Sequence, residues 1–294
     1  MIKPVRWKLL ILILISVIPV GKAQHNPVLL FPKGAPDETV QMVEKADIAE
    51  EADGSSILRI TNVSEPTITI YPASGENKNA PAMVVCPGGG YSILAYDLEG
   101  DEICEWLNSI GITAVLLKYR VPRREGREKH AAPLQDVQRA IGYVRAHAKD
   151  LGIDPGRIGV MGFSAGAHLS AMVSTNFSQR TYPAIDAADR VSCRPDFCLL
   201  VYPAYLDGEY FQVAPELKVS AQTPPTMLIQ TEDDKPYINS SLFYYYALKE
   251  AGVPVWMHLY STGGHGYGLR DKGTAVTTWP ARAKDWFREL KVIP

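Results

Sequence analysis

The sequence predicts an α/β fold in which a mostly parallel, doubly wound sheet of eight strands forms a single domain. Short strand-like runs alternate with helical patterns along the chain. From Ala82 onward, each strand-like run is continuous and rich in Val, Ile, Leu and Met, as expected of strands that are buried on both faces of a sheet. No linker-like stretch divides the chain after residue 56, and its 294 residues, 46% of them hydrophobic, suffice for one substantial core.

The expected elements follow in chain order from these patterns. The candidate strands are Ile57–Thr61, Thr67–Tyr71, Ala82–Cys86, Ile112–Lys118, Arg157–Gly162, Phe197–Tyr202, Thr226–Thr231 and Val255–Tyr260. The clearest helix is 133–151, because Pro133 suits a first turn, apolar residues recur at helical spacing, and Gly152 follows as a stop signal. The other expected helices are Gly100–Ser109, Ala165–Thr175, Ser240–Ala251 and Thr278–Leu290.

Residues 1–23 have the order of a secretory signal peptide: basic residues, an apolar run of about a dozen residues, and Gly21-Lys22-Ala23 at the end. The run is shorter than the roughly 20 residues of a bilayer span, although a retained N-terminal anchor is a competing interpretation. We therefore expect cleavage after Ala23, export to the periplasm or the medium, and no membrane contact in the mature form. Residues 24–56 are predicted to be irregular, and the α/β domain is predicted to span 57–294.

The net charge bears on nucleic-acid binding, and the cysteines bear on disulfides and metal binding. A net charge of −2 and a pI of about 6.3 provide no basic surface for nucleic acid, so no nucleic-acid partner is expected. Cys86 and Cys104 lie in apolar patterns and are expected to be buried free thiols. Cys193 and Cys198 are close enough in sequence to pair in an exported protein. None of the four has metal-ligand spacing.

The strongest chemical signal is Gly162-Phe163-Ser164-Ala165-Gly166, which follows a buried strand and opens a helix. In that setting the pattern G-x-S-x-G is typical of a nucleophile elbow, a tight turn that lifts the serine hydroxyl above the edge of the sheet. Gly162 and Gly166 face each other across such a turn, where larger side chains would clash. The alternative is an ordinary glycine-rich turn in which Ser164 caps the helix.

A serine hydroxyl needs a base to act as a nucleophile near pH 7. Among the six histidines, His265 is favoured because it lies in Gly263-Gly264-His265-Gly266, a loop that follows the last candidate strand. Loops at this edge of an α/β sheet are where catalytic groups gather. His168 lies one helical turn after Ser164 and is expected to point away from the elbow. A purely structural turn histidine is the alternative for His265.

The imidazole in turn needs a carboxylate to orient it, and the chain order in this arrangement is serine, acid, histidine. Three acids, Glu232, Asp233 and Asp234, directly follow the strand that ends at Thr231. The third position after the strand is the usual one, which favours Asp234. Asp233 remains an alternative, and Asp207, after the preceding strand, is a weaker candidate.

Three consecutive glycines, Gly88-Gly89-Gly90, follow the first buried strand. Their backbone N–H groups could hold a developing oxyanion, because no Cβ hinders the approach of the substrate oxygen. The N–H of Ala165 is expected to be the second donor. A Walker-type phosphate loop is excluded because no Lys-Ser/Thr pair follows the glycines. This chemistry uses no metal and no cofactor, and none is expected.

Taken together, these motifs resemble the exported acetyl xylan esterase-like and bacterial feruloyl esterase-like branch of the α/β-hydrolase (esterase/lipase) superfamily. The similarity covers nearly all of the chain after residue 23. Its landmarks are Phe31-Pro32-Lys33-Gly34-Ala35-Pro36, Val85-Cys86-Pro87-Gly88-Gly89-Gly90-Tyr91, Leu117-Lys118-Tyr119-Arg120, Pro133-Leu134-Gln135-Asp136, Gly162-Phe163-Ser164-Ala165-Gly166, Glu232-Asp233-Asp234 and Gly263-Gly264-His265-Gly266.

The resemblance implies an α/β-hydrolase fold with a triad of Ser164, Asp234 and His265. It also implies an oxyanion hole lined by Gly89, Gly90 and Ala165, and no metal. The implied function is a serine esterase that removes acyl groups, acetyl above all, from a small-molecule or oligosaccharide ester. The alternatives are a feruloyl or general short-chain carboxylesterase, a peptidase of the prolyl-oligopeptidase type, and a non-catalytic binding protein that keeps the fold.

Overall fold

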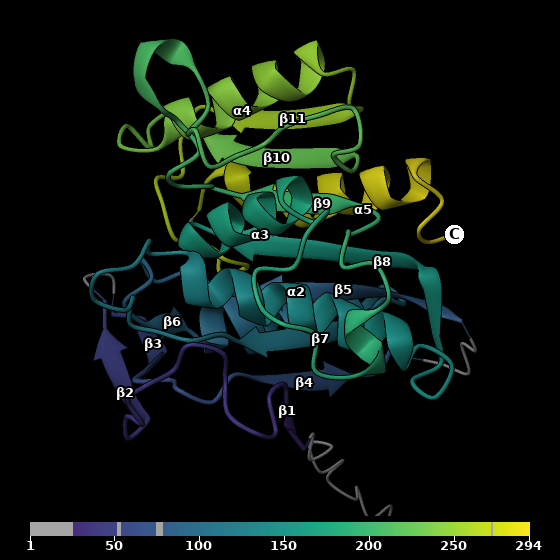
Figure 1. Ribbon diagram of the computed structural model, residues 1–294. Coiled ribbons are helices and arrows are strands. Elements are labelled where there is room, and N and C mark those ends of the chain that lie inside the picture. Colours follow the sequence, from purple (N-terminus) through teal and green to yellow (C-terminus); the bar gives the residue numbers. More distant parts are fainter. Residues whose placement is uncertain (1–25, 52–53, 75–78, 272) are drawn as a thin grey trace, which may run out of the picture.

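The computed structural model describes residues 26–51, 54–74, 79–271 and 273–294, so the expected signal peptide at 1–23 lies outside the described residues. Within these ranges, an eight-stranded sheet runs through the middle of the molecule (Figure 1). Its strands, in sheet order, are β1 (Val28–Leu29), β4 (Thr67–Tyr71), β7 (Thr113–Lys118), β5 (Ala80–Cys86), β8 (Ile153–Phe163), β9 (Cys198–Val201), β10 (Thr226–Thr231) and β11 (Val255–Tyr260). β1 and β4 pair antiparallel to their neighbours, and the strands from β7 to β11 are parallel. The predicted mostly parallel sheet is confirmed.

Helices cover both faces of this sheet, as a doubly wound chain requires (Figure 1). On one face, apolar side chains of α2 (Ala131–Ala146), α3 (Ala165–Thr175) and α4 (Ile238–Glu250) join the core. On the other face, α1 (Glu102–Ser109) and α5 (Trp279–Glu289) do so. All five helices that the sequence predicts are present, with ends that differ by a few residues.

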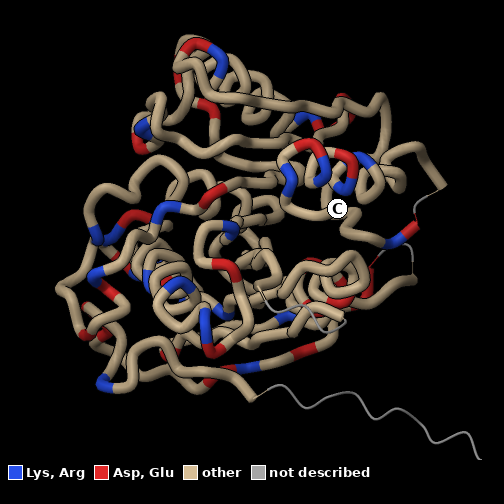
Figure 2. The backbone as a smooth tube through the Cα atoms, turned by 90° about the vertical axis from the view of Figure 1, so that its right-hand side faces the viewer, with Lys and Arg blue, Asp and Glu red and all other residues tan. Residues whose placement is uncertain are grey.

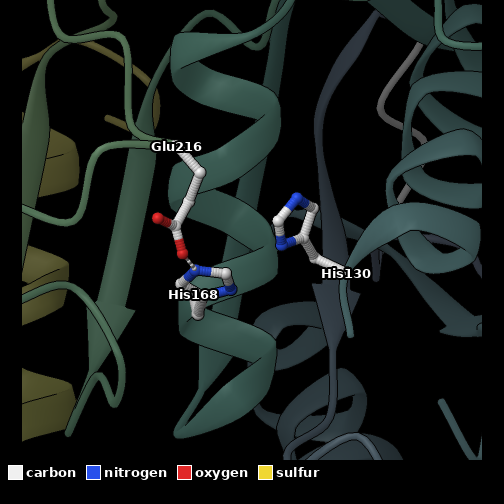
Figure 3. A group of neighbouring side chains, drawn as sticks. All are labelled: His130, His168 and Glu216. Carbon is white, nitrogen blue, oxygen red and sulfur yellow. Dashed lines mark ion pairs between the residues drawn. The ribbon is translucent and has the colours of Figure 1, made fainter. Parts of the chain in front are cut away.

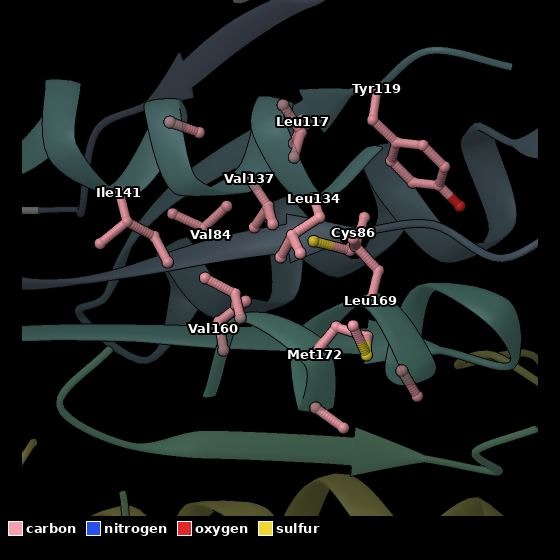
Figure 4. Close-up of a cluster of buried hydrophobic side chains, with 14 of the residues drawn as sticks. Val84, Cys86, Leu117, Tyr119, Leu134, Val137, Ile141, Val160, Leu169 and Met172 are labelled. Atoms are coloured by element: carbon pink, nitrogen blue, oxygen red, sulfur yellow. The ribbon is translucent and has the colours of Figure 1, made fainter. Parts of the chain in front are cut away.

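The core between the sheet and α2 and α3 explains why the central strands are so apolar (Figure 4). Val84 of β5 and Val160 of β8 lie on neighbouring strands and are fully buried beneath Val137 and Ile141 of α2. A second core covers the opposite face of the same strands. Strands that are covered on both sides carry apolar residues at every position, which is the pattern that the sequence displays.

The N-terminal part of the chain differs from its prediction. Residues 24–56, expected to be irregular, contribute β1 to the edge of the main sheet and β2 (Lys45–Glu50) to a separate three-stranded sheet. There β2 pairs with β3 (Ser56–Thr61), which also pairs with β6 (Leu94–Ala95). The predicted strand 57–61 therefore exists but lies outside the main sheet, where β1 is the eighth strand. The apolar pattern misses β1 because it has only two residues, and misses β2 because nearly all of its residues are exposed and half of them are charged.

The parallel strands bring four loops to one edge of the sheet. The carboxyl ends of β5, β8, β10 and β11 are followed by loops that begin at Pro87, Ser164, Glu232 and Ser261. These loops carry, respectively, the glycine-rich segment, the elbow, the acids and the histidine that the sequence singles out. In an open α/β sheet this edge is where ligands bind, so the topology gathers all the predicted site residues.

All four cysteines are buried free thiols, so the alternative of a Cys193–Cys198 disulfide is wrong. The Cys193 thiol contacts the Phe177 carbonyl oxygen at 3.4 Å, whereas Cys198 lies in β9 and belongs to the core. Basic and acidic residues are interspersed along the chain in the view of Figure 2, in keeping with the net charge of −2. In the part of the chain that the structure describes, no helix has both the length and the hydropathy of a membrane span.

Candidate active site

Ser164 occupies the sharp turn between β8 and α3, where its backbone is left-handed, with φ 52° and ψ −117°. Its N–H donates to the Val201 carbonyl of β9 at 3.1 Å, which ties the turn to the sheet. A Cβ at Gly162 would overlap the carbonyl oxygen of Gly166, and a Cβ at Gly166 would overlap that of Cys86. The two glycines are therefore required by the close packing of the turn, which has the strained geometry of a nucleophile elbow.

Three of the predicted residues form one hydrogen-bonded line. His265 Nε2 lies 2.8 Å from Ser164 Oγ, and His265 Nδ1 lies 2.8 Å from Asp234 Oδ2. The Asp234 side chain is 1% exposed, whereas the His265 side chain is 30% exposed. An ionised carboxylate only accepts, so Asp234 takes the Nδ1–H of His265 and leaves Nε2 to accept the hydroxyl proton of Ser164.

The neighbouring acids have other partners. The Asp233 carboxylate accepts hydrogen bonds from the backbone N–H groups of Gly263 and Gly264, at 3.1 and 2.8 Å. These contacts fix the start of the loop that carries His265 and lower the pKa of Asp233. Asp207 accepts a hydrogen bond from the Ser240 hydroxyl instead. Of the candidate acids, Asp234 is thus the one in contact with His265.

The glycine loop presents free backbone donors beside the serine. Gly89 and Gly90 have φ values of 128° and 63°, and neither N–H has a hydrogen-bond partner among the described residues. The N–H of Ala165 opens α3 and has no acceptor within the helix. A Cβ built on Gly88 would lie 3.0 Å from Ser164 Cβ, so the loop passes directly beside the elbow. The predicted donors therefore lie on the two segments that flank the serine hydroxyl.

A cavity of about 440 Å³ opens over Ser164 and His265. The rings of Tyr202 and Tyr237 each lie 4.9 Å from the imidazole of His265, measured between centroids, and hold it in place. The cavity has apolar, aromatic and charged walls, which include Ile57, Arg59, Ile93, Leu98, Tyr205 and Tyr237. A volume of this size falls in the range of small-molecule binding sites.

Glu99 is a site residue that the sequence reasoning missed. It is 4% exposed and accepts hydrogen bonds from the Gly88 N–H (2.6 Å) and the Tyr202 hydroxyl (2.9 Å). The Tyr202 oxygen also accepts from the Gly268 N–H at 3.2 Å. Burial raises the pKa of Glu99. Glu99 thus joins the glycine loop to the loop of His265. It has no sequence signal of its own, because it is one of four acids among residues 97–102.

Gly166→Ala is expected to destabilise the elbow. The new Cβ would collide with the carbonyl oxygens of Cys86 and Pro87, which belong to backbone and cannot swing away. We expect the free energy of unfolding to fall by about 3 kcal/mol or more and hydrolysis to fall with it. The matched control is Gly156→Ala, where a Cβ meets nothing closer than Asp154 Oδ1 at 3.4 Å. Urea unfolding of both variants checks this, and equal stabilities would contradict it.

Glu99→Gln is expected to lower kcat about tenfold. Glutamine offers one acceptor oxygen where the carboxylate offers two, so either Gly88 or Tyr202 loses its partner. A buried donor without a partner lowers the free energy of unfolding by about 1–3 kcal/mol. The glycine loop, which the Glu99 carboxylate positions, is then expected to shift. Steady-state kinetics should show the loss in kcat rather than in KM. Glu105→Gln, an exposed carboxyl on α1, is the control, and an unchanged kcat in Glu99→Gln would refute the role.

Comparisons with known proteins place esterases among the relatives of this chain. The BD-FAE family model matches residues 68–192, which contain the glycine loop and the elbow. An acetylxylan esterase of Xylanibacter ruminicola is 34% identical over 238 residues, 72% of this chain and 48% of that protein. Endo-1,4-beta-xylanase B of Butyrivibrio fibrisolvens is 31% identical over 205 residues, 63% of this chain and 32% of that protein. The chain therefore spans half or less of the length of these curated relatives.

Solved structures match over almost their full length. The acetyl ester-xyloside bifunctional hydrolase of Caldicellulosiruptor lactoaceticus is 34% identical, with a TM-score of 0.75, and the match covers 92% of this chain and 98% of that one. MGS-M1, an α/β hydrolase from a Medee basin deep-sea metagenome library, is 29% identical, with a TM-score of 0.64 and coverages of 85% and 99%. The chain belongs to the BD-FAE, acetylxylan esterase-like family of α/β-hydrolase esterases.

Proposed function

We propose that the protein is a serine carboxylic ester hydrolase that works through an acyl-enzyme. The observation that carries this proposal is the line of two 2.8 Å contacts from Ser164 through His265 to Asp234, of which Ser164 and His265 line an open cavity. Nucleophile, base and orienting acid are then in hydrogen-bond contact before substrate arrives.

In the proposed mechanism, His265 Nε2 takes the hydroxyl proton while Ser164 Oγ attacks the ester carbonyl carbon. The carbonyl oxygen becomes an oxyanion, and His265 then delivers its proton to the departing alcohol oxygen. Water repeats the sequence on the acyl-enzyme: it loses a proton to His265, releases the carboxylic acid, and restores Ser164. Asp234 stays ionised throughout and stabilises the imidazolium. No metal or cofactor takes part in these steps.

The oxyanion is proposed to rest on backbone donors. Gly89 and Gly90 line the same cavity as Ser164, Ala165 directly follows it, and the glycines lack a Cβ that would obstruct the substrate oxygen. Each such donor contributes about 3–4 kcal/mol to lowering the barrier in a water-poor site. Glu99 acts as a positioning residue, because its carboxylate holds the Gly88 N–H and so the start of this loop.

For the substrate, we propose acetyl groups on acylated carbohydrate. The names of the relatives, an acetylxylan esterase, a xylanase and an acetyl ester-xyloside hydrolase, support this class. The residues that line the cavity also support it. The rings of Tyr205 and Tyr237 offer flat apolar faces to a sugar, and Arg59 offers hydrogen-bond donors to hydroxyl or acyl oxygens. Ferulate esters and simple short-chain esters are the competing substrates.

A panel of substrates at equal concentration tests the assignment. It contains acetylated xylo-oligosaccharides, p-nitrophenyl acetate and butyrate, methyl ferulate and an N-acetyl-alanine p-nitroanilide. We expect the highest kcat/KM on the acetylated oligosaccharides and stoichiometric labelling by a fluorophosphonate probe. If methyl ferulate were cleaved faster than the acetylated oligosaccharides, the protein would be a feruloyl esterase. Cleavage of the anilide alone would indicate a peptidase. A protein that the probe does not label would indicate a non-catalytic binding module.

Export is proposed from the N-terminal sequence alone. The basic, apolar and small-residue order of residues 1–23 supports removal after Ala23. Mass spectrometry of the protein from periplasm or medium should then find a chain that begins at Gln24. A chain that begins at Met1 in these fractions would contradict the proposal.

A further inference from the structure

Three side chains behind the glycine loop converge in a way that the proposed hydrolysis does not use (Figure 3). His130 directly precedes α2, His168 lies in α3, and Glu216 lies in the segment between β9 and β10. One ring nitrogen of each histidine and one carboxylate oxygen of Glu216 all lie within 4.8 Å of one another. Segments that are far apart in the sequence thus bring two imidazoles and a carboxylate to one point.

Two ring nitrogens of this cluster have no hydrogen-bond partner. His168 is fully buried, and its Nδ1 lies 2.8 Å from the Tyr91 hydroxyl. Its Nε2 is buried and has no hydrogen bond among the described residues; the nearest carboxylate oxygen, of Glu216, is 3.5 Å away. His130 Nδ1 is also buried and unpartnered within the described part of the chain. Buried polar atoms are nearly always paired, so two orphans that face one carboxylate point to a missing ligand.

The donor atoms of the cluster suit a divalent cation. Imidazole nitrogens and a carboxylate oxygen are a ligand set that zinc favours in proteins. The neighbouring ammonium of Lys129 lies over the ring of Tyr205, 3.7 Å from its centroid.

From this geometry we infer a binding site for a divalent transition metal of the zinc class, formed by His130, His168 and Glu216. Tetrahedral zinc with bonds of about 2.1 Å places its ligand atoms about 3.4 Å apart. The His168–Glu216 separation, 3.5 Å, is close to this value, and the separations from the His130 nitrogen, at most 4.8 Å, are compatible with closure around a bound ion. The Glu216 side chain is 27% exposed, which gives the metal access from solvent and leaves room for water as a fourth ligand.

The metal would act on the structure of the active site rather than on the reaction. Coordination through Nε2 fixes the proton of His168 on Nδ1, which then donates to the Tyr91 oxygen. Tyr91 directly follows Gly90, and His168 lies one turn beyond Ser164 on α3. The inferred site would therefore clamp the glycine loop, the elbow helix and the segment of Glu216 together.

Metal binding is tested on the protein purified without a histidine tag. After treatment with a chelator, it is titrated with Zn²⁺ by calorimetry, and the bound metal is counted by mass spectrometry. We expect one zinc per chain, and a visible spectrum typical of tetrahedral cobalt when Co²⁺ is used instead. His130→Ala and Glu216→Gln, both at partly exposed positions, should each weaken binding at least tenfold.

The control is His147→Ala, which removes a histidine that stacks on Tyr143 outside the cluster, and it should bind zinc within twofold of the wild type. Circular dichroism shows whether each variant is folded. Failure of the wild type to bind zinc, or equal binding by all four proteins, would overturn the proposal and leave His168 and Glu216 as a long polar contact. These measurements count metal and not hydrolysis, so their outcome is independent of the proposed esterase activity.

Discussion

Ser164→Ala should reduce kcat/KM on p-nitrophenyl acetate by about 10⁵- to 10⁶-fold. The variant loses the only atom that attacks the ester, and His265 is left without a hydroxyl to activate. The residual rate comes from the backbone donors of the glycine loop and from binding. The fold should persist, because the hydrogen bond from residue 164 to the Val201 carbonyl uses the backbone N–H and not the side chain.

The matched control for this variant is Ser170→Ala. Ser170 lies on the same helix, and its hydroxyl donates to the Gly166 carbonyl at 2.9 Å rather than to an imidazole. It should lose about 1 kcal/mol of stability, keep most of the activity and still react with the fluorophosphonate probe. If Ser164→Ala retained a tenth of the wild-type rate, or still took up the probe, Ser164 would not be the nucleophile.

The sequence predicts the parts of this fold that are buried on both sides. β5 and the second half of β8, from Ile158 to Phe163, are buried at every position and carry only apolar residues and glycine, so they are visible as continuous runs. β1 and β2 are missed because edge and surface strands carry no such constraint. β3 is found but assigned to the wrong sheet, because its apolar residues indicate a partly covered strand but do not indicate which element covers it.

Within the site, a sequence motif reveals a residue only when the local backbone geometry also restricts the residues next to it in the chain. Ser164 is visible because the tight turn demands glycines on either side of it. Glu99 and the cluster of His130, His168 and Glu216 are not visible, because their partners come from distant segments. A contact between residues far apart in the chain leaves no local pattern, so it appears only once the strands are placed.

The structure distinguishes Asp233 from Asp234 by the partners of their carboxylates. Both residues follow β10, and the sequence alone leaves them as alternatives. Asp234 Oδ2 contacts the His265 imidazole, whereas the Asp233 carboxylate accepts hydrogen bonds from the N–H groups of Gly263 and Gly264, the two residues that precede His265. One acid would therefore set the protonation of the histidine, and the other would set the path of the loop that carries it.

Asp234→Asn should consequently lower kcat by about 10⁴-fold, with KM and stability little changed. An asparagine amide turned toward Nδ1 of His265 donates a hydrogen bond, which favours the tautomer whose Nε2 carries the proton. That imidazole cannot accept the proton of Ser164. Asp233→Asn keeps an acceptor oxygen for one of the two glycine N–H groups and should lose less than tenfold. Steady-state kinetics on the two variants, prepared side by side, gives the answer: a larger loss in Asp233→Asn would transfer the catalytic role to that residue.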